Sequence, residues 1–442
     1  VVGDEAGTAI TTGDGNVFTG YASGDALTLG SNNTAIGRDS LGADTRGNHS
    51  VAIGRNALTT QNFTSATDAY NTAVGSSAGA AVTTGDSNTL IGALAGDALT
   101  EGTDNVVVGK SSLSADTLGS RSVALGKNTL AAQNFTSATN TYNTAVGHDA
   151  GKAVTTGVQN TLIGGLAGDA LTDADNNVAI GYHSLNADTL GSKSVAVGPY
   201  ALYSQNFTSA TNSFNTAVGA DAGLLVTTGT QNTLIGGLAG DALTTGYHNV
   251  ALGYAALTAD TLGRSTVAIG NEALSTQNFT SATDSFNVAV GDQAGKSVTT
   301  GSINTLIGGL SGDALTDGNS NVAVGYDSLG AETRGDRNVA IGVAALQVQN
   351  NTSNVDAYNT AVGYGAGALV TTGIANTLIG GLAGDVLTDA DFNVAVGQSA
   401  LSADTLGSRS VAVGSSALAS QNFTSATDGF NTAVGHVAGY AI

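Results

Sequence analysis

One pentapeptide pattern recurs along the whole chain and constrains its fold more than any other feature. Within one 72-residue block it reads NTAVG at 71, NTLIG at 88, NVVVG at 105 and SVALG at 122, and NTAVG returns at 143. The spacings are therefore 17, 17, 17 and 21 residues. Followed along the chain, this register gives 24 starts from Asn16 to Asn431, each with glycine in its fifth position. Such regularity is typical of a chain whose successive turns stack on one another.

The segments between the glycines are short, strand-like and without helical periodicity. We therefore predict an all-β parallel β-solenoid, or β-roll, of about 24 rungs spaced by about 4.8 Å. Each rung has 17 residues except every fourth, which has 21, so the super-repeat is 72 residues long. Stacked asparagines at the first position are expected to form side-chain amide ladders. A six-bladed propeller is the alternative, but its four strands per blade occupy different environments, whereas all four rungs here carry one signature.

The array is expected to form a single domain over residues 1–442. The chain starts without methionine and ends part-way through a repeat, so we expect it to be a piece of a longer chain.

The pentapeptide is apolar on both faces of its predicted strand, because side chains alternate in direction. We predict that the fourth position, such as Val74 and Ile91, fills the solenoid core. The third position is mainly alanine, with leucine in every fourth rung, as at Leu90 and Leu162. It is predicted to meet another chain, with the leucines as knobs.

Composition excludes several classes of function. The chain has 63 glycines and one proline, and it lacks cysteine, so it has no disulfide, no thiolate nucleophile and no cysteine-based zinc site. Its formal net charge is −21 with only 13 Lys and Arg, which argues against nucleic acid as a partner. No apolar run approaches the roughly 18 residues of a membrane span.

Neither the histidines nor the carboxylates predict catalysis, a metal or a cofactor. The five histidines fall at different rung positions. Two carboxylate columns do recur: Asp25, Asp97, Asp169, Asp241, Asp313 and Asp385, and then Asp44, Asp116, Asp188, Asp260, Glu332 and Asp404. Calcium needs several oxygen ligands at one point, so these aspartates are predicted to form turns and cap loops. Basic residues are expected to pair with the second column at Arg121, Lys193, Arg264, Arg337 and Arg409.

The 21-residue rung carries the heptapeptide QNFTSAT. Its phenylalanines are Phe63, Phe135, Phe207, Phe279 and Phe423, and the rung ends with Tyr70, Tyr142, Phe214, Phe286, Tyr358 or Phe430. These aromatics are expected either to form a ridge that binds a glycan or another partner, or to fold back and seal the bulge. The packing interpretation is favoured because exposed aromatic loops promote self-association. Each long rung also carries a glycosylation sequon, at Asn62, Asn134, Asn206, Asn278, Asn350 and Asn422.

Threonines at the thirteenth position, Thr83, Thr100 and Thr117, admit an ice-binding solenoid as a minor alternative. The long rung interrupts this array, and threonine suits strands in any case. A polysaccharide-active β-helix enzyme is the other minor alternative, but it needs one cleft with convergent carboxylates, which uniform rungs do not supply.

The strings NTAVG, NVAIG and SVAIG, each followed by a short loop and a small residue such as Ala78 or Ser112, resemble the head repeats of trimeric autotransporter adhesins. Related strings occur in phage tail-fibre-like proteins. The resemblance implies a left-handed β-roll, three chains side by side, and an extracellular or cell-surface role as an adhesin or fibre shaft without enzymatic activity. It also implies self-association as a homotrimer or filament, with a host-surface or glycan receptor. The alternative is a phage tail-fibre shaft on a virion. The 21-residue rung departs from the family's shorter repeat.

Overall fold

The computed structural model describes residues 1–441 and confirms the all-β parallel solenoid; the described residues contain no helix. It divides into two compact units, Val1–Ala220 and Asp221–Ile442. Each unit holds 12 main strands of three residues, and each main strand is the middle of one pentapeptide. The fifth-position glycine ends every strand.

The main strands of the first unit follow one another at the predicted spacings. They are β1 (Val17–Thr19), β2 (Thr34–Ile36), β4 (Val51–Ile53), β6 (Thr72–Val74), β7 (Thr89–Ile91), β8 (Val106–Val108), β10 (Val123–Leu125), β12 (Thr144–Val146), β13 (Thr161–Ile163), β14 (Val178–Ile180), β16 (Val195–Val197) and β18 (Thr216–Val218).

The second unit repeats the pattern. Its main strands are β19 (Thr233–Ile235), β20 (Val250–Leu252), β22 (Val267–Ile269), β24 (Val288–Val290), β25 (Thr305–Ile307), β26 (Val322–Val324), β28 (Val339–Ile341), β30 (Thr360–Val362), β31 (Thr377–Ile379), β32 (Val394–Val396), β34 (Val411–Val413) and β36 (Thr432–Val434).

Within each unit, neighbouring main strands pair in parallel and in register. Thr144 lies opposite Thr161 and Ala145 opposite Leu162 where β12 meets β13. The 21-residue rung keeps the register, since Val123 of β10 lies opposite Thr144 of β12. Equivalent residues therefore stack, and the four extra residues leave the main sheet undisturbed.

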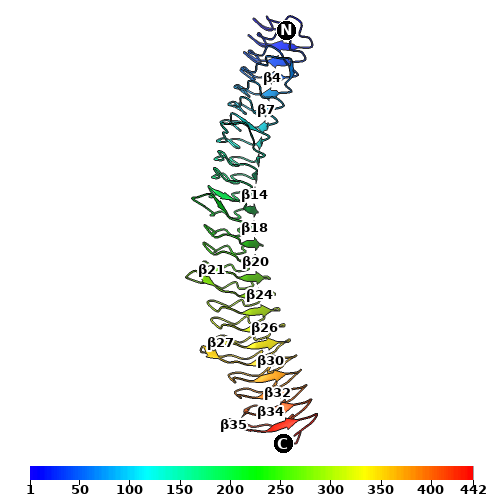
Figure 1. Cartoon of the computed structure of the whole chain (residues 1–442), viewed down its shortest axis with the longest axis vertical. Coiled ribbons are helices and arrows are strands. Elements are labelled where there is room, and N and C mark those ends of the chain that lie inside the picture. The colour runs from blue at the N-terminus through cyan, green and yellow to red at the C-terminus, as the bar shows by residue number, and fades with distance from the viewer. Residues whose placement is uncertain (442) are drawn as a thin grey trace. The chain divides into compact units, whose positions relative to one another are not determined.

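Each long rung adds a short two-stranded parallel sheet with the rung before it. In the first unit these pairs are β3 (Gly47–Asn48) with β5 (Thr67–Asp68), β9 (Gly119–Ser120) with β11 (Thr139–Asn140), and β15 (Gly191–Ser192) with β17 (Thr211–Asn212). In the second unit they are β21 (Gly263–Arg264) with β23 (Thr283–Asp284), β27 (Gly335–Asp336) with β29 (Val355–Asp356), and β33 (Gly407–Ser408) with β35 (Thr427–Asp428). Figure 1 shows β21 and β27 on the opposite side of the coil from β24 and β26.

The predicted assignment of the two strand faces is wrong. The third position fills the core: Ala73, Leu90 and Ala124 are all 0% exposed. The fourth position points outward, and Ile91 is 38% exposed. The strand is therefore half-buried, with one residue directed inward between two directed outward.

The third-position leucines pack inside their own chain and do not lie on a surface that could contact another chain. A methyl group added at Gly79 would lie 2.6 Å from the Cδ1 atom of Leu90, and one at Gly96 would lie 2.9 Å from its Cδ2 atom. Leu90 thus occupies the space that two glycines leave open on the far wall. Where that wall carries Leu113 or Leu130 instead, the facing strand positions are the smaller Val107 and Ala124. Large and small residues alternate across the core and fill it.

The first-position asparagines are buried and bind the next rung, although mainly through the backbone. The Asn71 Oδ1 atom accepts from the Asn88 backbone N–H at 2.9 Å, and Asn88 Nδ2 donates to the Gly102 carbonyl at 2.9 Å. Direct amide-to-amide bonds are longer, such as Asn88 Nδ2 to Asn71 Oδ1 at 3.3 Å. The predicted ladder exists, but each asparagine chiefly satisfies backbone groups of its neighbouring rungs.

One interior column distinguishes the four rungs of a period. At the twelfth position it reads Val82, Leu99, Asp116 and Gln133, and all four side chains are 0% exposed. The same order recurs as Val154, Leu171, Asp188 and Gln205. We refer to the first two as apolar rungs and to the last two as polar rungs.

Candidate functional site

The outward face of the main strands is the most extensive uniform surface of each unit. Its second-position residues are Thr or Val in all 24 pentapeptides, and its fourth-position residues are Val, Ile or Leu in all but one, which has Thr19. Ile91, Ile163 and Leu252 are 38%, 36% and 41% exposed. We call this surface the sheet face.

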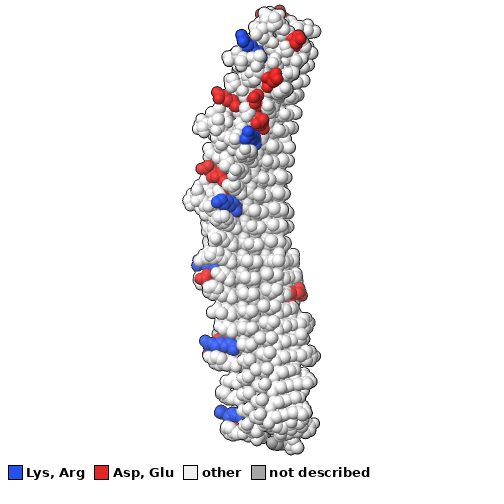
Figure 2. All heavy atoms as spheres, turned by 45° about the vertical axis from the view of Figure 1, so that its right-hand side comes forward, with Lys and Arg blue, Asp and Glu red and all other residues white. Residues whose placement is uncertain are grey.

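The sheet face carries no charged residue, because every second- and fourth-position residue is apolar or Thr. The side of the molecule that carries the main strands in Figure 1 comes forward in Figure 2. In the lower part of that view the charged side chains lie mostly along the left edge, and a broad area beside them is almost free of charge. Exposed apolar surface of this kind marks a place of association.

The polar rungs enclose a buried side-chain network. The Asp116 Oδ1 atom accepts from the backbone N–H groups of Gly119 at 3.1 Å and Phe135 at 3.2 Å, and Oδ2 accepts from Gln133 Nε2 at 2.6 Å. The Gln133 Oε1 atom accepts from Asn143 Nδ2 at 2.9 Å. The carboxylate thus caps its own turn and holds the start of the long loop, in agreement with the predicted capping role.

Burial raises the pKa of the Asp116 and Asp260 carboxyl groups, because loss of water disfavours their charge. The hydrogen bonds from Gln133 and Gln277 act in the opposite direction. A buried carboxylate with all its acceptors committed to one loop has a structural role, and it offers no free oxygen to a substrate.

Four of the QNFTSAT phenylalanines lie inside the solenoid. Phe63, Phe135, Phe207 and Phe279 are only 5%, 6%, 5% and 6% exposed, and Phe423 is of intermediate exposure. A buried ring has little surface to offer to a partner. The geometry therefore supports packing for this set, and the rings seal the interior beneath the inserted residues.

All six sequon asparagines are exposed. They occupy the thirteenth position, where the other rungs carry threonine, and each accepts a hydrogen bond from the threonine one rung earlier. The distances are 3.0 Å from Thr45 to Asn62, 3.1 Å from Thr117 to Asn134, 3.2 Å from Thr189 to Asn206, 3.0 Å from Thr261 to Asn278, 2.9 Å from Thr333 to Asn350 and 3.3 Å from Thr405 to Asn422. Their accessibility is compatible with glycosylation, which stays a prediction.

The aromatics that end the long rungs lie on the surface. We call them the aromatic column: Tyr70, Tyr142, Phe214, Phe286, Tyr358 and Phe430, with exposures of 58%, 51%, 52%, 57%, 55% and 70%. The backbone of each is left-handed, with φ between 47° and 51°. Bulky residues adopt this conformation uncommonly, so their ring positions are set by the repeat rather than by local preference.

The basic residues pair with exposed carboxylates rather than with the buried column, contrary to expectation. Arg121 Nε lies 3.6 Å from Asp104, and Arg409 Nε lies 2.9 Å from Asp428. The first carboxylate column, whose aspartates each follow a glycine and which we call the Gly-Asp column, is half-buried. Burial raises the pKa of Asp97 and Asp385. Each of these two side chains has one buried oxygen without a partner in the described part of the chain.

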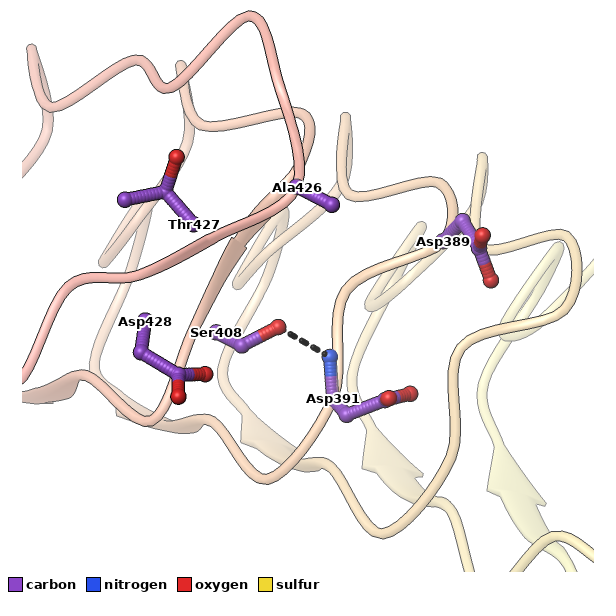
Figure 3. A pocket seen from close by; sticks show the side chains of 6 residues that line it. All are labelled: Asp389, Asp391, Ser408, Ala426, Thr427 and Asp428. Carbon is purple, nitrogen blue, oxygen red and sulfur yellow. Dashed lines mark hydrogen bonds between the residues drawn. The ribbon is translucent and has the colours of Figure 1, made fainter.

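One depression with an acidic lining lies beside the last long rung. It is formed by Asp389, Asp391, Ser408, Ala426, Thr427 and Asp428. Figure 3 shows that its three carboxylates point in different directions, and the Ser408 hydroxyl accepts the Asp391 N–H at 3.0 Å. Throughout residues 1–441, no group of three or more His, Asp or Glu side chains is placed to hold a metal ion.

Comparison of the chain with protein-family models and with curated proteins finds no match. In the part of the chain that the structure describes, no helix is long and apolar enough to cross a membrane.

The sequence contains a signal that identifies the inward face of the strand. Leucine at the third position is accompanied by glycine at the ninth, as with Leu90 and Gly96, and leucine at the ninth is accompanied by the smaller alanine or valine at the third, as with Leu130 and Ala124. Such complementary sizes indicate that the two positions face each other across one core.

Proposed function

We propose that this chain is a structural fibre or adhesin shaft outside the cell, in which copies associate through the sheet face, most simply as a homotrimer. The observation that carries the proposal is the absence of charge from the sheet face, whose second- and fourth-position residues are Thr, Val, Ile or Leu in every rung of each unit. Monomeric proteins rarely leave such continuous apolar surface in water.

A second copy of the same chain is the occupant that fits this face best. Its rungs have the same spacing, so side chains of one copy meet grooves of another at every rung. β-Branched residues present stiff, regular ridges, and the absence of charge avoids burying an unpaired ion. Three copies related by a rotation axis would close such an interface without leaving an open end.

The thirteenth-position threonines give ice binding no support, because their hydroxyls donate hydrogen bonds to backbone carbonyls of the next rung. Thr83 Oγ1 donates to the Thr100 carbonyl at 3.2 Å, and Thr100 Oγ1 donates to the Thr117 carbonyl at 3.0 Å. We propose no catalytic role, since the carboxylates recur in each period and those of the polar rungs are committed to loops. A phage tail-fibre shaft on a virion is the alternative biological setting for the same assembly.

Charge introduced on the sheet face tests the proposal. The double variant Ile91→Lys with Ile163→Lys is compared with Ala66→Lys with Ala138→Lys, which adds the same charge on exposed loop residues. Light scattering after size-exclusion chromatography is expected to give about three times the protomer mass for the wild type and the loop variant, and the protomer mass for the sheet-face variant. A monomeric wild type, or a sheet-face variant that assembles like the wild type, would refute association through this face.

A further inference from the structure

The aromatic column is the second surface that repeats with the 72-residue period. Each unit carries three of its members, and those within a unit recur every four rungs, or about 19 Å. Their side chains are more than half exposed, whereas the four phenylalanines Phe63, Phe135, Phe207 and Phe279, each seven residues before a member of the column, are buried. The column is therefore separate from the packing of the long loop, and it consists of aromatic side chains that the core does not use.

In four of the six periods a basic side chain of the preceding rung supports the ring. The His49 and Tyr70 rings stack with centroids 5.2 Å apart, and the Arg121 Cζ atom lies 5.7 Å from the Tyr142 centroid. The corresponding pairs in later periods are Lys193 Nζ with Phe214 at 5.3 Å and Arg337 Cζ with Tyr358 at 5.6 Å. The His49–Tyr70 stacking and the three cation–π contacts restrict these rings, so their exposed surfaces are presented in a fixed orientation.

Hydrogen-bonding groups lie beside the Tyr142 ring. Arg121 Nη1 donates to the Tyr142 hydroxyl at 2.8 Å, while Arg121 Nε lies 3.6 Å from Asp104 Oδ2. The side chains of Arg121 and Asp104 are 45% and 50% exposed, so donors and acceptors remain open to a ligand. The Tyr142 module thus combines an exposed aromatic ring with a charged pair at its edge.

We propose that the aromatic column binds a neutral polysaccharide, one segment of the polymer per module. The C–H groups on a pyranose face pack on the negative face of an aromatic ring, and the hydroxyls bond to the neighbouring guanidinium and carboxylate groups. A ligand that itself repeats engages several modules at once and gains affinity by multivalency. The net charge of −21 disfavours an anionic polymer.

This site lies on side chains other than those of the sheet face, so the proposal does not depend on self-association. A shaft that fails to trimerise still presents the column, and a trimer without the column loses only the polysaccharide. The two proposals therefore fail in distinguishable ways.

Native gel electrophoresis of the whole chain, in gels containing hydroxyethyl cellulose or galactomannan, tests the proposal. The column variant replaces Tyr70, Tyr142, Phe214 and Tyr358 by Ser. The matched control replaces four other exposed tyrosines by Ser, at Tyr182, Tyr254, Tyr326 and Tyr364, which are 51%, 58%, 57% and 66% exposed. Circular dichroism verifies that both variants fold.

We expect at least one neutral polysaccharide to retard the wild type and the control, and the apparent Kd of the column variant to rise by about 100-fold. Tyr142→Ser alone should give a small loss of affinity, and Tyr142→Ser with Tyr358→Ser a larger one, both smaller than the loss in the fourfold variant. These two variants keep the test decisive if the fourfold variant does not fold. The proposal is overturned if neither neutral gel retards the wild type, if the column variant is retarded equally, or if only a gel containing anionic alginate retards the chain.

Discussion

The apolar and polar rungs of one period share the same strand and the same asparagine column, yet they close the coil differently. In the apolar rungs, Val82 and Leu99 fill this column of the interior, and Leu90 fills the space beside Gly79 and Gly96. In the polar rungs, Asp116 and Gln133 occupy the same column. The Asp116 carboxylate accepts from the Phe135 backbone N–H of the inserted loop, and Gln133 Nε2 donates to that carboxylate. The four extra residues are thus held by hydrogen bonds from buried polar side chains, which Val and Leu at the same column cannot form.

The largest effect is expected where the long rung is sealed. Phe135→Ala removes a ring that is 6% exposed and should cost about 3 to 5 kcal/mol of stability, because the cavity cannot collapse onto a stacked backbone. Tyr142→Ala, seven residues later, removes a ring that is 51% exposed and should change stability by less than about 0.5 kcal/mol. Hydrogen exchange of peptides covering residues 116–143 measures both. Equal losses would contradict the division between buried and exposed aromatics.

A smaller but sharp effect is expected in an apolar rung, between two adjacent glycines. Gly164 has φ +138°, and a Cβ atom there would lie 2.4 Å from the Gly181 carbonyl oxygen. Gly164→Ala should therefore cost at least about 3 kcal/mol.

Gly165→Ala is the control for this change, because its Cβ atom would meet nothing closer than the Tyr182 ring at 3.5 Å. Its effect on stability should be below about 0.5 kcal/mol. The urea midpoints of the two variants are compared with that of the wild type. Tolerance of alanine at residue 164 would show that the strand ends are less tightly stacked than the structure indicates.

Removal of the Gln133 side-chain amide tests whether the buried network of the polar rungs is required for stability. Gln133→Leu leaves the Asp116 carboxylate and the Asn143 amide each without one buried partner, and it should cost about 2 to 3 kcal/mol. Leu99→Met, a conservative change at the same column in an apolar rung, should cost less than about 1.5 kcal/mol. Urea denaturation gives both values. If Gln133→Leu left the free energy of unfolding unchanged, the polar rungs would tolerate an apolar interior.

The smallest expected effect is a dependence of stability on pH. Burial raises the folded-state pKa of Asp116, Asp260 and several Gly-Asp carboxyls, among them Asp97 and Asp313. Above the ordinary aspartate pKa of about 4, the folded state then binds more protons than the unfolded state, so stability falls as pH rises. The urea midpoint should be higher at pH 5 than at pH 7. Asp116→Asn together with Asp260→Asn should reduce this difference, and a midpoint that rises with pH would contradict it.

The pentapeptide register predicted the number, spacing and parallel order of the main strands, because identical residues at fixed spacing can stack in only a few ways. The capping role of the Asp116 column followed from its spacing too. The assignment of Leu90 to an interface between chains did not hold, since a three-residue strand that is apolar on both faces has no period from which its inward side can be read. Tyr142 and Phe135 likewise belong to the same residue class and the same rung, and only their burial separates them.

The sequence by itself therefore determined the solenoid, its 17- and 21-residue rungs and the absence of cysteine chemistry, since these follow from composition and local spacing. Only the tertiary structure decided which side of each strand is enclosed, which aromatic of the long rung is buried, and where the Asp116 carboxylate finds its partners. The physical reason is that burial depends on what lies across the coil. Gly79 and Gly96 open the space that Leu90 fills, and their contact exists only after the chain has turned back on itself.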